Sequence, residues 1–210
     1  MPRWGMVVDL DQCIGCGSCE RVCSAVHGPA THWRNVHDVG LTVGSDQRRL
    51  AVPTSCMHCA DAPCVEVCPT TASYVRADGI VAVDDQKCIG CGYCIMACPY
   101  DARMLSPAGL AISQTPSKPR RSVEVATKCT FCSHKLDEGL KNDLNPGVDS
   151  AATPECVVAC SAGALTFGDL DAPHETMAVK LSLRHKTQIN AELGTRPSIY
   201  YLGLDREWEK

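Results

Sequence analysis

Apolar residues along the chain occur in short runs, which predict small strands and hairpins. Residues 5–9 form an apolar run typical of a short strand. The segments 39–43 and 50–52 flank the polar stretch 44–49 and predict a hairpin. Residues 74–83 carry an Asp-Gly pair between two apolar runs, which is typical of a tight hairpin turn.

The later part of the chain has fewer such patterns. Residues 100–105 and 110–112 predict another hairpin, 175–186 a helix, and 198–202 an apolar strand. No apolar run approaches the roughly 20 residues that a membrane-spanning helix needs. We therefore expect no direct membrane span.

Two polar segments show neither the alternation of apolar residues typical of a strand nor the spacing typical of a helix. Residues 24–38 contain His27, His32 and His37, which share no helical face. We therefore interpret this segment as a solvated loop in preference to a metal site. Residues 113–123 are basic and rich in proline, and form either a solvated connector or a docking contact for an acidic partner.

The cysteines change this picture, because their spacing predicts metal clusters. Cys88, Cys91 and Cys94 are spaced by two residues, and Cys98 and Pro99 follow after three more. Such a run curls a loop around one iron–sulfur cluster and turns its fourth thiolate toward a neighbouring cluster. A zinc site would need two separated pairs and no third closely spaced thiol.

All sixteen cysteines fall into four such groups. The first and third groups share the sequence Cys-Ile-Gly-Cys-Gly, which marks an internal repeat. In the fourth group a long gap separates two cysteine pairs, so a zinc ribbon is the alternative there. We favour a cluster because the second pair has the helical spacing of the other runs. The groups are Cys13, Cys16, Cys19, Cys23; Cys56, Cys59, Cys64, Cys68; Cys88, Cys91, Cys94, Cys98; and Cys129, Cys132, Cys156, Cys160.

Composition and charge agree with bound clusters. The chain has 210 residues but only two phenylalanines, so we expect the clusters to replace part of an ordinary core. The formal charge is −4. Four clusters, each of net charge about −2 with its thiolates, would bring it to about −12. This charge argues against a nucleic-acid partner and favours one with a basic surface.

No motif predicts catalysis by this chain. It has no dinucleotide-binding loop, no phosphate-binding loop and no nucleophile with an identifiable base. His58 and His134 could bond cluster sulfur or simply pack. Lys87 and Lys128 each precede a cysteine group, where they could raise the local reduction potential or be exposed.

The order of the groups resembles the four-cluster electron-transfer subunit of the molybdopterin oxidoreductase (dimethyl sulfoxide reductase) family. The chain looks most like its polysulfide, thiosulfate and arsenate reductase branch. Ser161 replaces the proline that usually follows the last cysteine, and residues 141–153 look like an insertion in a surface loop. Outside the cysteines the likeness lies in residues 5–10, 98–103, 128–132, 167–170 and 194–201.

The resemblance implies four [4Fe-4S] clusters with exchanged fourth ligands. Relatives that hold a three-iron cluster have tryptophan where this chain has Cys91, so we expect four-iron clusters throughout. The implied ligand sets are Cys13, Cys16, Cys19, Cys160 (cluster 1); Cys23, Cys129, Cys132, Cys156 (cluster 2); Cys56, Cys59, Cys64, Cys98 (cluster 3); and Cys68, Cys88, Cys91, Cys94 (cluster 4).

The implied fold is α+β, with two ferredoxin-like lobes of short hairpins and short helices around a cluster-dominated core. The expected parts are an outer lobe from residues 1–55 and 124–170, an inserted central lobe from 56–112, a connector at 113–123, and a C-terminal docking extension at 171–210.

The implied function is electron relay between a molybdopterin catalytic subunit and a quinone-reactive membrane anchor. Cluster 1 would lie nearest the catalytic subunit and cluster 4 nearest the membrane. The alternatives are a freestanding polyferredoxin-type carrier and a maturation or sensor protein; the apolar segment 199–202 favours a subunit with a docking surface. Residues 1–5 hold no signal-peptide segment. We therefore expect membrane association through a partner, on the cytoplasmic face or in the periplasm after co-export with a signal-bearing partner.

Overall fold

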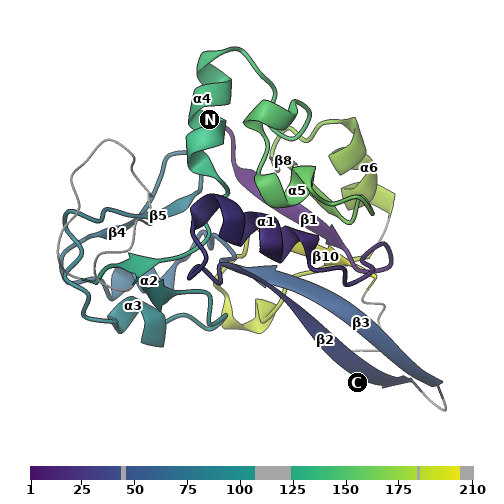
Figure 1. The fold of residues 1–210 in the computed structure, drawn as a ribbon, viewed down its shortest axis with the longest axis horizontal. Coiled ribbons are helices and arrows are strands. Elements are labelled where there is room, and N and C mark those ends of the chain that lie inside the picture. The colour runs from purple at the N-terminus through teal and green to yellow at the C-terminus, as the bar shows by residue number, and fades with distance from the viewer. Residues whose placement is uncertain (44–45, 107–123, 184, 204–210) are drawn as a thin grey trace.

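The computed structural model describes residues 1–43, 46–106, 124–183 and 185–203. A four-stranded sheet joins the two ends of this chain, with strand order β8-β1-β10-β9 (Figure 1). β1 pairs parallel to β10 and antiparallel to β8. The predicted strands at 5–9 and 198–202 are therefore confirmed. The strands are β1 (Trp4–Asp9), β8 (Leu165–Asp169), β9 (Lys186–Thr187) and β10 (Ile199–Leu202).

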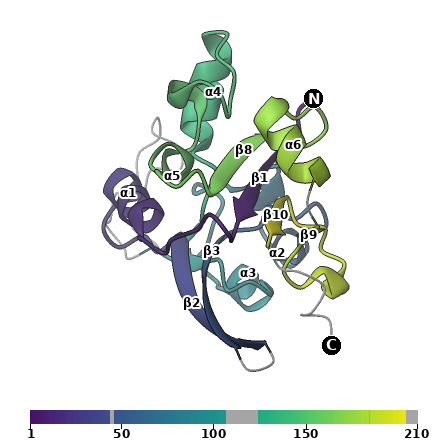
Figure 2. The ribbon, with the colours of Figure 1, turned by 90° about the vertical axis from the view of Figure 1, so that its right-hand side faces the viewer.

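The two faces of this sheet pack against different elements. Met6 and Val8 of β1 belong to the main core, which also contains most of the cysteines. Val7 points to the other face, where it packs with Leu202 and with Met177 of α6 (Glu175–Leu183). Figure 2 shows α1 and α6 on opposite sides of β1. The helix predicted at 175–186 is confirmed for residues 175–183, whereas Lys186 belongs to β9, and the helix covers the face away from the cysteines.

β10 is an internal strand, so our interpretation of residues 199–202 as part of a docking surface is wrong. Ile199, Tyr201 and Leu202 are fully buried because β10 lies between β1 and β9. The Tyr201 hydroxyl donates a hydrogen bond of 2.9 Å to the carbonyl of Pro53. The apolar character of this segment thus reflects the core of the protein.

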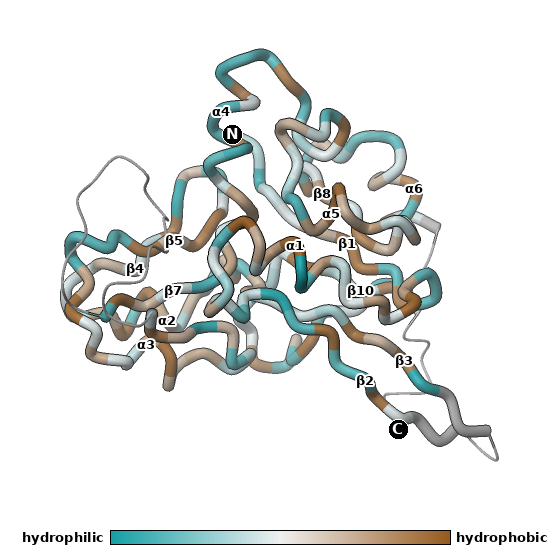
Figure 3. The backbone as a smooth tube through the Cα atoms, viewed as in Figure 1, coloured by the Kyte–Doolittle hydropathy of each residue, from teal (hydrophilic) through white to brown (hydrophobic). Residues whose placement is uncertain are grey.

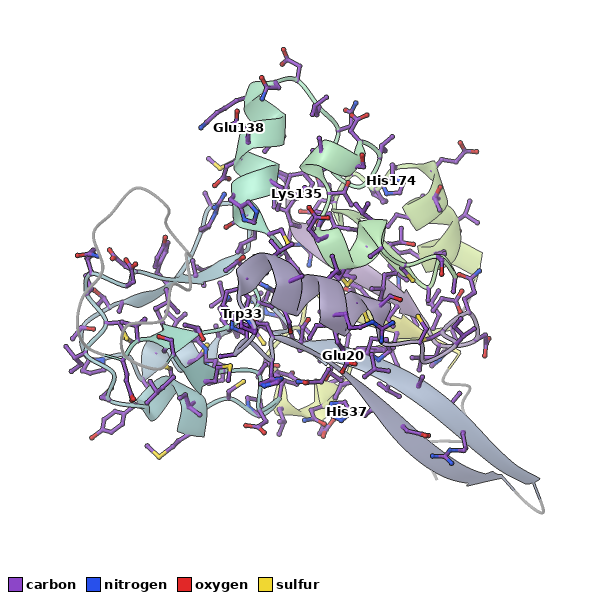
Figure 4. The ribbon with its side chains drawn as sticks, viewed as in Figure 1. Glu20, Trp33, His37, Lys135, Glu138 and His174 are labelled. Carbon is purple, nitrogen blue, oxygen red and sulfur yellow. The ribbon has the colours of Figure 1, made fainter. Side chains whose placement is uncertain are left out.

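The first hairpin is longer than predicted and projects from the body as an arm (Figure 1). Its strands are β2 (Arg34–Val43) and β3 (Asp46–Ser55), and Arg34 pairs with Ser55. The loop predicted at 24–38 is therefore wrong in part, because residues 24–27 belong to a helix and 34–38 to β2. In Figure 4, Glu20 lies beside this region, and its Oε1 accepts a hydrogen bond of 2.6 Å from the backbone of Val36.

The other hairpins are short. β4 (Ser73–Val75) and β5 (Val81–Val83) confirm the hairpin predicted at 74–83, and Gly79 has a φ of 81° in its turn. β6 (Met104–Leu105) pairs with β7 (Ala126–Thr127). The partner expected for β6 at 110–112 and the connector at 113–123 lie outside the described residues.

The helices carry the ends of the cysteine groups. α1 (Ser18–His27) contains Cys19 and Cys23. Three four-residue helices each contain the third cysteine of a group, and the fourth cysteine follows each helix. These helices are α2 (Pro63–Glu66), α3 (Tyr93–Met96) and α5 (Glu155–Val158).

The segment 141–153 folds back onto α4 (Ser133–Lys141) through the 3-10 helix η1 (Ser150–Ala152). Ala152 is fully buried, and a Cβ added to Gly139 would lie 2.3 Å from the Cβ of Ala152. The prediction of a surface loop is therefore wrong around Ala152. The outer part is exposed, and Figure 3 shows it as largely hydrophilic. At the base of α4, Lys135 Nζ lies 2.7 Å from Glu155 Oε1 of α5 (Figure 4).

A second short 3-10 helix, η2 (Ala191–Leu193), precedes β10. No helix in the described ranges is long and apolar enough to cross a membrane. The described residues thus form a mixed structure of short helices and small sheets.

Candidate metal centres

The cysteine loops of the first and third groups owe their shape to glycine. Gly15, Gly17, Gly90 and Gly92 have φ between 68° and 78°, a region that other residues rarely adopt. A Cβ added to Gly90 would lie 2.5 Å from the carbonyl oxygen of Glu124. The repeated glycines noted in the sequence therefore allow the backbone to turn tightly between consecutive cysteines.

The second and fourth groups adopt the same turn with aromatic residues. His58 has a φ of 46° and Phe131 a φ of 53°, and each lies one residue before the second cysteine of its group, as Gly15 and Gly90 do. A left-handed conformation costs a residue with a Cβ about 1–2 kcal/mol. The rings of His58 and Phe131 stack with centroids 3.8 Å apart. The strained positions thus place a buried aromatic pair between the two groups.

The first site lies at the protein surface. Cys13, Cys16, Cys19 and Cys160 line one cavity, which contains about 350 Å³ of atom-free space, part of it open to solvent. Cys16 is exposed, and the side chain of Ile14 beside it is 72% exposed. The structure therefore brings together the four cysteines expected for cluster 1.

All four cysteines of the second site are buried. Cys23, Cys129, Cys132 and Cys156 line a cavity of about 320 Å³, part of it open to solvent, together with His27. Burial raises the pKa of the Cys132 thiol to about 12. The zinc ribbon considered for the fourth group would need Cys160 here as well. That alternative is wrong, because Cys160 lines the first cavity instead.

The third site lies in the interior of the protein. Burial raises the pKa of the Cys59 thiol to about 12, and the other three thiols of the expected set add to the increase. Cys56, Cys59 and Cys64 are buried, whereas Cys98 is half-buried. The phenol of Tyr100 and the hydroxyl of Thr195 lie 2.5 Å apart beside this set.

The fourth site lies at the protein surface, as the first site does. Cys68, Cys88, Cys91 and Cys94 line a cavity of about 330 Å³, part of it open to solvent. Cys91 is exposed, and so are the side chains of Ile89, Tyr93 and Met96 around it. Backbone N–H groups reach two of these thiols, from Ser73 to Cys68 Sγ and from Ala126 to Cys88 Sγ, both at 3.4 Å.

These sites fit a bound group that carries its own hydrogen-bond acceptors. Arg34, Arg103 and His58 each bury at least one side-chain nitrogen for which the described residues provide no hydrogen-bond partner within normal distance. Such orphaned donors are costly unless a bound group satisfies them. Inorganic sulfide surrounded by four thiolates supplies acceptors of this kind.

The two lysines before cysteine groups differ in their environments. Lys128 is fully buried, and its Nζ donates to the carbonyls of Val81 and Cys129, the latter at 2.7 Å. The side chain of Lys87 is 59% exposed and lies 4.0 Å from Asp84. Exposure is therefore the correct interpretation for Lys87 and the wrong one for Lys128.

The two histidines singled out in the sequence also differ. His58 is fully buried, and its Nδ1 accepts a hydrogen bond of 3.1 Å from Val81. Burial, together with the charge of Lys128, holds the pKa of His58 well below its usual range, so His58 is neutral. His134 is exposed, and its ring packs edge-on against that of His27, with ring centroids 5.7 Å apart.

The sequence analysis assigned His27 to a solvated loop and did not single out Arg34 or Arg103, although all three lie near the sites. His27 lies 3.5 Å from Cys132 Sγ, and its position four residues after Cys23 on one helix was a usable signal. Burial lowers the pKa of His27 to about 4. Arg34 and Arg103 are also buried near the sites, and neither carries a local signal.

Comparison with known proteins gives two matching family models and several relatives that span nearly the whole chain. Models described as 4Fe-4S dicluster domains match residues 48–170 and 12–72. A tetrathionate reductase subunit from Salmonella typhimurium is 37% identical over 97% of this chain and 73% of its own length. The arsenate respiratory reductase iron–sulfur subunit of Shewanella sp. is 33% identical over 95% of this chain and 96% of its own. The menaquinone reductase iron–sulfur cluster-binding subunit of Nitratidesulfovibrio vulgaris is 33% identical over 98% and 90%.

Proposed function

The chain belongs to the 4Fe-4S dicluster family, among the iron–sulfur subunits of the molybdopterin oxidoreductases, and on that premise we propose that it holds its four [4Fe-4S] clusters in one row. The family makes it an electron-transfer subunit with no catalytic residues of its own. When bound, the clusters take up and release single electrons. The observation that supports a row is the exposure of the cysteines. Cys16 and Cys91 are exposed at two of the sites, whereas the cysteines of the other two sites are buried except for the half-buried Cys98.

We assign one set of four thiolate ligands to each site. The support is geometric, since three of the sets each line a common cavity and the thiols of the remaining set interact with one another. The proposed sets are Cys13, Cys16, Cys19, Cys160; Cys23, Cys129, Cys132, Cys156; Cys56, Cys59, Cys64, Cys98; and Cys68, Cys88, Cys91, Cys94.

The helices support the order of the row. α1 and α5 pack together, and each carries or precedes one ligand of the first site and one of the second. α2 and α3 link the third and fourth sites in the same way. The stacked pair His58 and Phe131 connects the second site to the third. The order 1-2-3-4 follows from these three connections.

The same connections support two ferredoxin-like lobes. We propose that residues 1–55 and 124–170 hold sites 1 and 2, and that residues 56–112 hold sites 3 and 4. Residues 171–210 form the proposed C-terminal extension, although β9 and β10 are strands of the central sheet. A docking role in that extension would therefore belong to residues outside the buried strand β10.

The exposed sites are the proposed contacts with partners. Site 1 would receive the molybdopterin catalytic subunit and site 4 a quinone-reactive membrane anchor. Apolar side chains surround both, with Ile14 at site 1 and Ile89, Tyr93 and Met96 at site 4. The similarity to the menaquinone reductase subunit favours a quinone-linked partner. The chain would then be membrane-associated through that anchor.

Purification of the native protein tests this proposal. We expect it to elute with a larger molybdenum- or tungsten-containing subunit, and we expect Cys91→Ser to reduce quinol-linked turnover of the complex. A freestanding carrier would instead purify as a lone monomer without either metal. That result, or unchanged turnover of the Cys91→Ser complex, would contradict the proposed function.

A further inference from the structure

Among the described residues, three lysine or arginine side chains are buried in the protein interior. Arg34 is 3% exposed, Arg103 5% and Lys128 0%. The contacts that the described structure gives them are with thiols, a thioether, a hydroxyl and carbonyls. Burying a charge without a counter-charge is strongly unfavourable. Their positions relative to the four sites therefore decide what these charges do.

Arg34 lies between the first and second sites. It lines the second cavity, and its Nη2 donates to Cys156 Sγ at 3.4 Å. Its charge also interacts with the thiol of Cys19, which belongs to the first set. Nε and Nη1 of the guanidinium are buried and have no protein acceptor.

Lys128 lies between the second and third sites. It directly precedes Cys129 of the second set, and its Nζ binds the carbonyl of Cys129. The same Nζ binds the carbonyl of Val81, whose N–H donates to His58 in the loop between Cys56 and Cys59. Burial lowers the pKa of Lys128, and the thiols of Cys56 and Cys64 in the third set oppose this decrease by favouring the charged form.

Arg103 lies between the third and fourth sites. Its Nη1 donates to Ser73 Oγ at 2.9 Å, and the N–H of Ser73 donates to Cys68 Sγ of the fourth set at 3.4 Å. Its charge interacts with Cys64 of the third set and Cys94 of the fourth. Nε and Nη2 are buried, and among the described residues the Cys94 thiol is the hydrogen-bonding group that interacts with this end of the guanidinium.

We propose that Arg34, Lys128 and Arg103 form a series of fixed positive charges, one at each of the three junctions in the row, and that each raises the reduction potentials of the two clusters beside it. The inference rests on the proposed function, because it takes the four sites as cluster sites. A cluster becomes more negative when it accepts an electron, so a nearby cation in a low-dielectric interior stabilises the reduced state. Hydrogen bonds from the orphaned guanidinium donors to cluster sulfide act in the same direction.

If the clusters lie in a row, each of the three substitutions should shift a different pair of midpoint potentials. Neutralising Arg34 should lower two of the four midpoint potentials, and neutralising Arg103 should lower the other two. Neutralising Lys128 should lower one potential from each of these pairs. This overlap pattern can be read without assigning any midpoint to a site in advance.

The experiment compares the complexes carrying Arg34→Met, Lys128→Met and Arg103→Met with the native complex, using redox titration followed by electron paramagnetic resonance. Lys87→Met is the matched control. Lys87 precedes a cysteine group just as Lys128 does, but its side chain is exposed to water. Solvent screens such a charge, so we expect the four midpoints of the control to be unchanged.

Several results would overturn the proposal. They are unshifted midpoints in all three buried variants, equal shifts of all four midpoints, and shifts as large in Lys87→Met. If a neutral variant assembles fewer than four clusters, the variant that keeps the charge at the same position shows whether the lost charge is the cause. Arg34→Lys, Lys128→Arg or Arg103→Lys should restore the iron content, and failure to restore it would count against a role for charge.

The two proposals fail in different ways. A native protein with fewer than four clusters, or without a catalytic partner, contradicts the proposed function. A native complex with four clusters whose midpoints lack the overlap pattern contradicts only the role of the three cations.

Discussion

The imidazole of His58 stacks on the phenyl ring of Phe131, with ring centroids 3.8 Å apart and planes inclined by 25°. Each residue occupies a left-handed position inside a cysteine loop where the other two loops have glycine. Phe131 also meets Phe167 of the central sheet edge-on, at 5.3 Å. The pair therefore connects the inner two sites to each other and to the core of the sheet.

We expect Phe131→Ala to destabilise the holoprotein. The change removes the stack with His58 and leaves a cavity in a fully buried position, which typically costs about 3–5 kcal/mol. The measurement is the rate at which cluster absorbance is lost on heating, which should rise. Ile89→Ala is the control, since Ile89 is 55% exposed in the third cysteine loop. Equal rates in the two variants would contradict the structural role of Phe131.

Two neighbouring glycines allow a matched test of loop geometry at the fourth site. Gly90→Ala places a Cβ 2.5 Å from the carbonyl oxygen of Glu124, whereas a Cβ at Gly92 meets nothing within 4 Å. Both variants bear the left-handed cost of about 1–2 kcal/mol, and only Gly90→Ala adds a backbone clash. Iron analysis should therefore show a larger loss in Gly90→Ala. An equal loss in the two variants would show that close approach to Glu124 is not limiting.

The exchange of ligands between groups predicts which cluster each cysteine affects. Cys160→Ser should alter the signal of the same cluster as Cys13→Ser, because both thiols line the first cavity. Cys156→Ser should alter the signal of the cluster affected by Cys129→Ser. Spectra of the four reduced variants provide the comparison. The proposed ligand sets would be wrong if Cys160→Ser paired with Cys129→Ser instead.

Removal of the clusters should unfold the chain, because cysteines make up much of its core. Without clusters these thiols would face empty cavities, so folding and cluster binding are one equilibrium. Circular dichroism after treatment with chelator and oxidant should show loss of the native spectrum. An apoprotein that retains the native spectrum would contradict this coupling. The cysteines in the buried part of the main core are Cys19, Cys23, Cys56, Cys59, Cys64, Cys88, Cys94, Cys129 and Cys156.

The sequence predicted the local features of the sites well, because iron–sulfur loops depend on short-range spacing. The four groups, the repeated glycines and the Asp-Gly hairpin are all encoded within a few residues of one another. The predicted grouping of cysteines from distant groups came from the family resemblance, and three of the four predicted sets each line one cavity.

The features that the sequence did not reveal depend on contacts between distant segments. Arg34 appeared to belong to a polar loop, yet β3 and the second cavity bury it. The apolar strand at 199–202 appeared suited to docking, yet it pairs parallel to β1 from the opposite end of the chain. Polarity along a sequence cannot distinguish a solvated cation from one buried beside anionic sites.

The most direct test of the row of four clusters is a reductive titration of the native complex, with the iron content and the number of unpaired spins measured on the same sample. Four [4Fe-4S] clusters predict about sixteen iron atoms per chain and four successive one-electron reductions. The account would be contradicted by fewer than four reductions in a sample with full iron content. It would also be contradicted if neither quinol nor the substrate of the catalytic partner reduced the clusters of the complex.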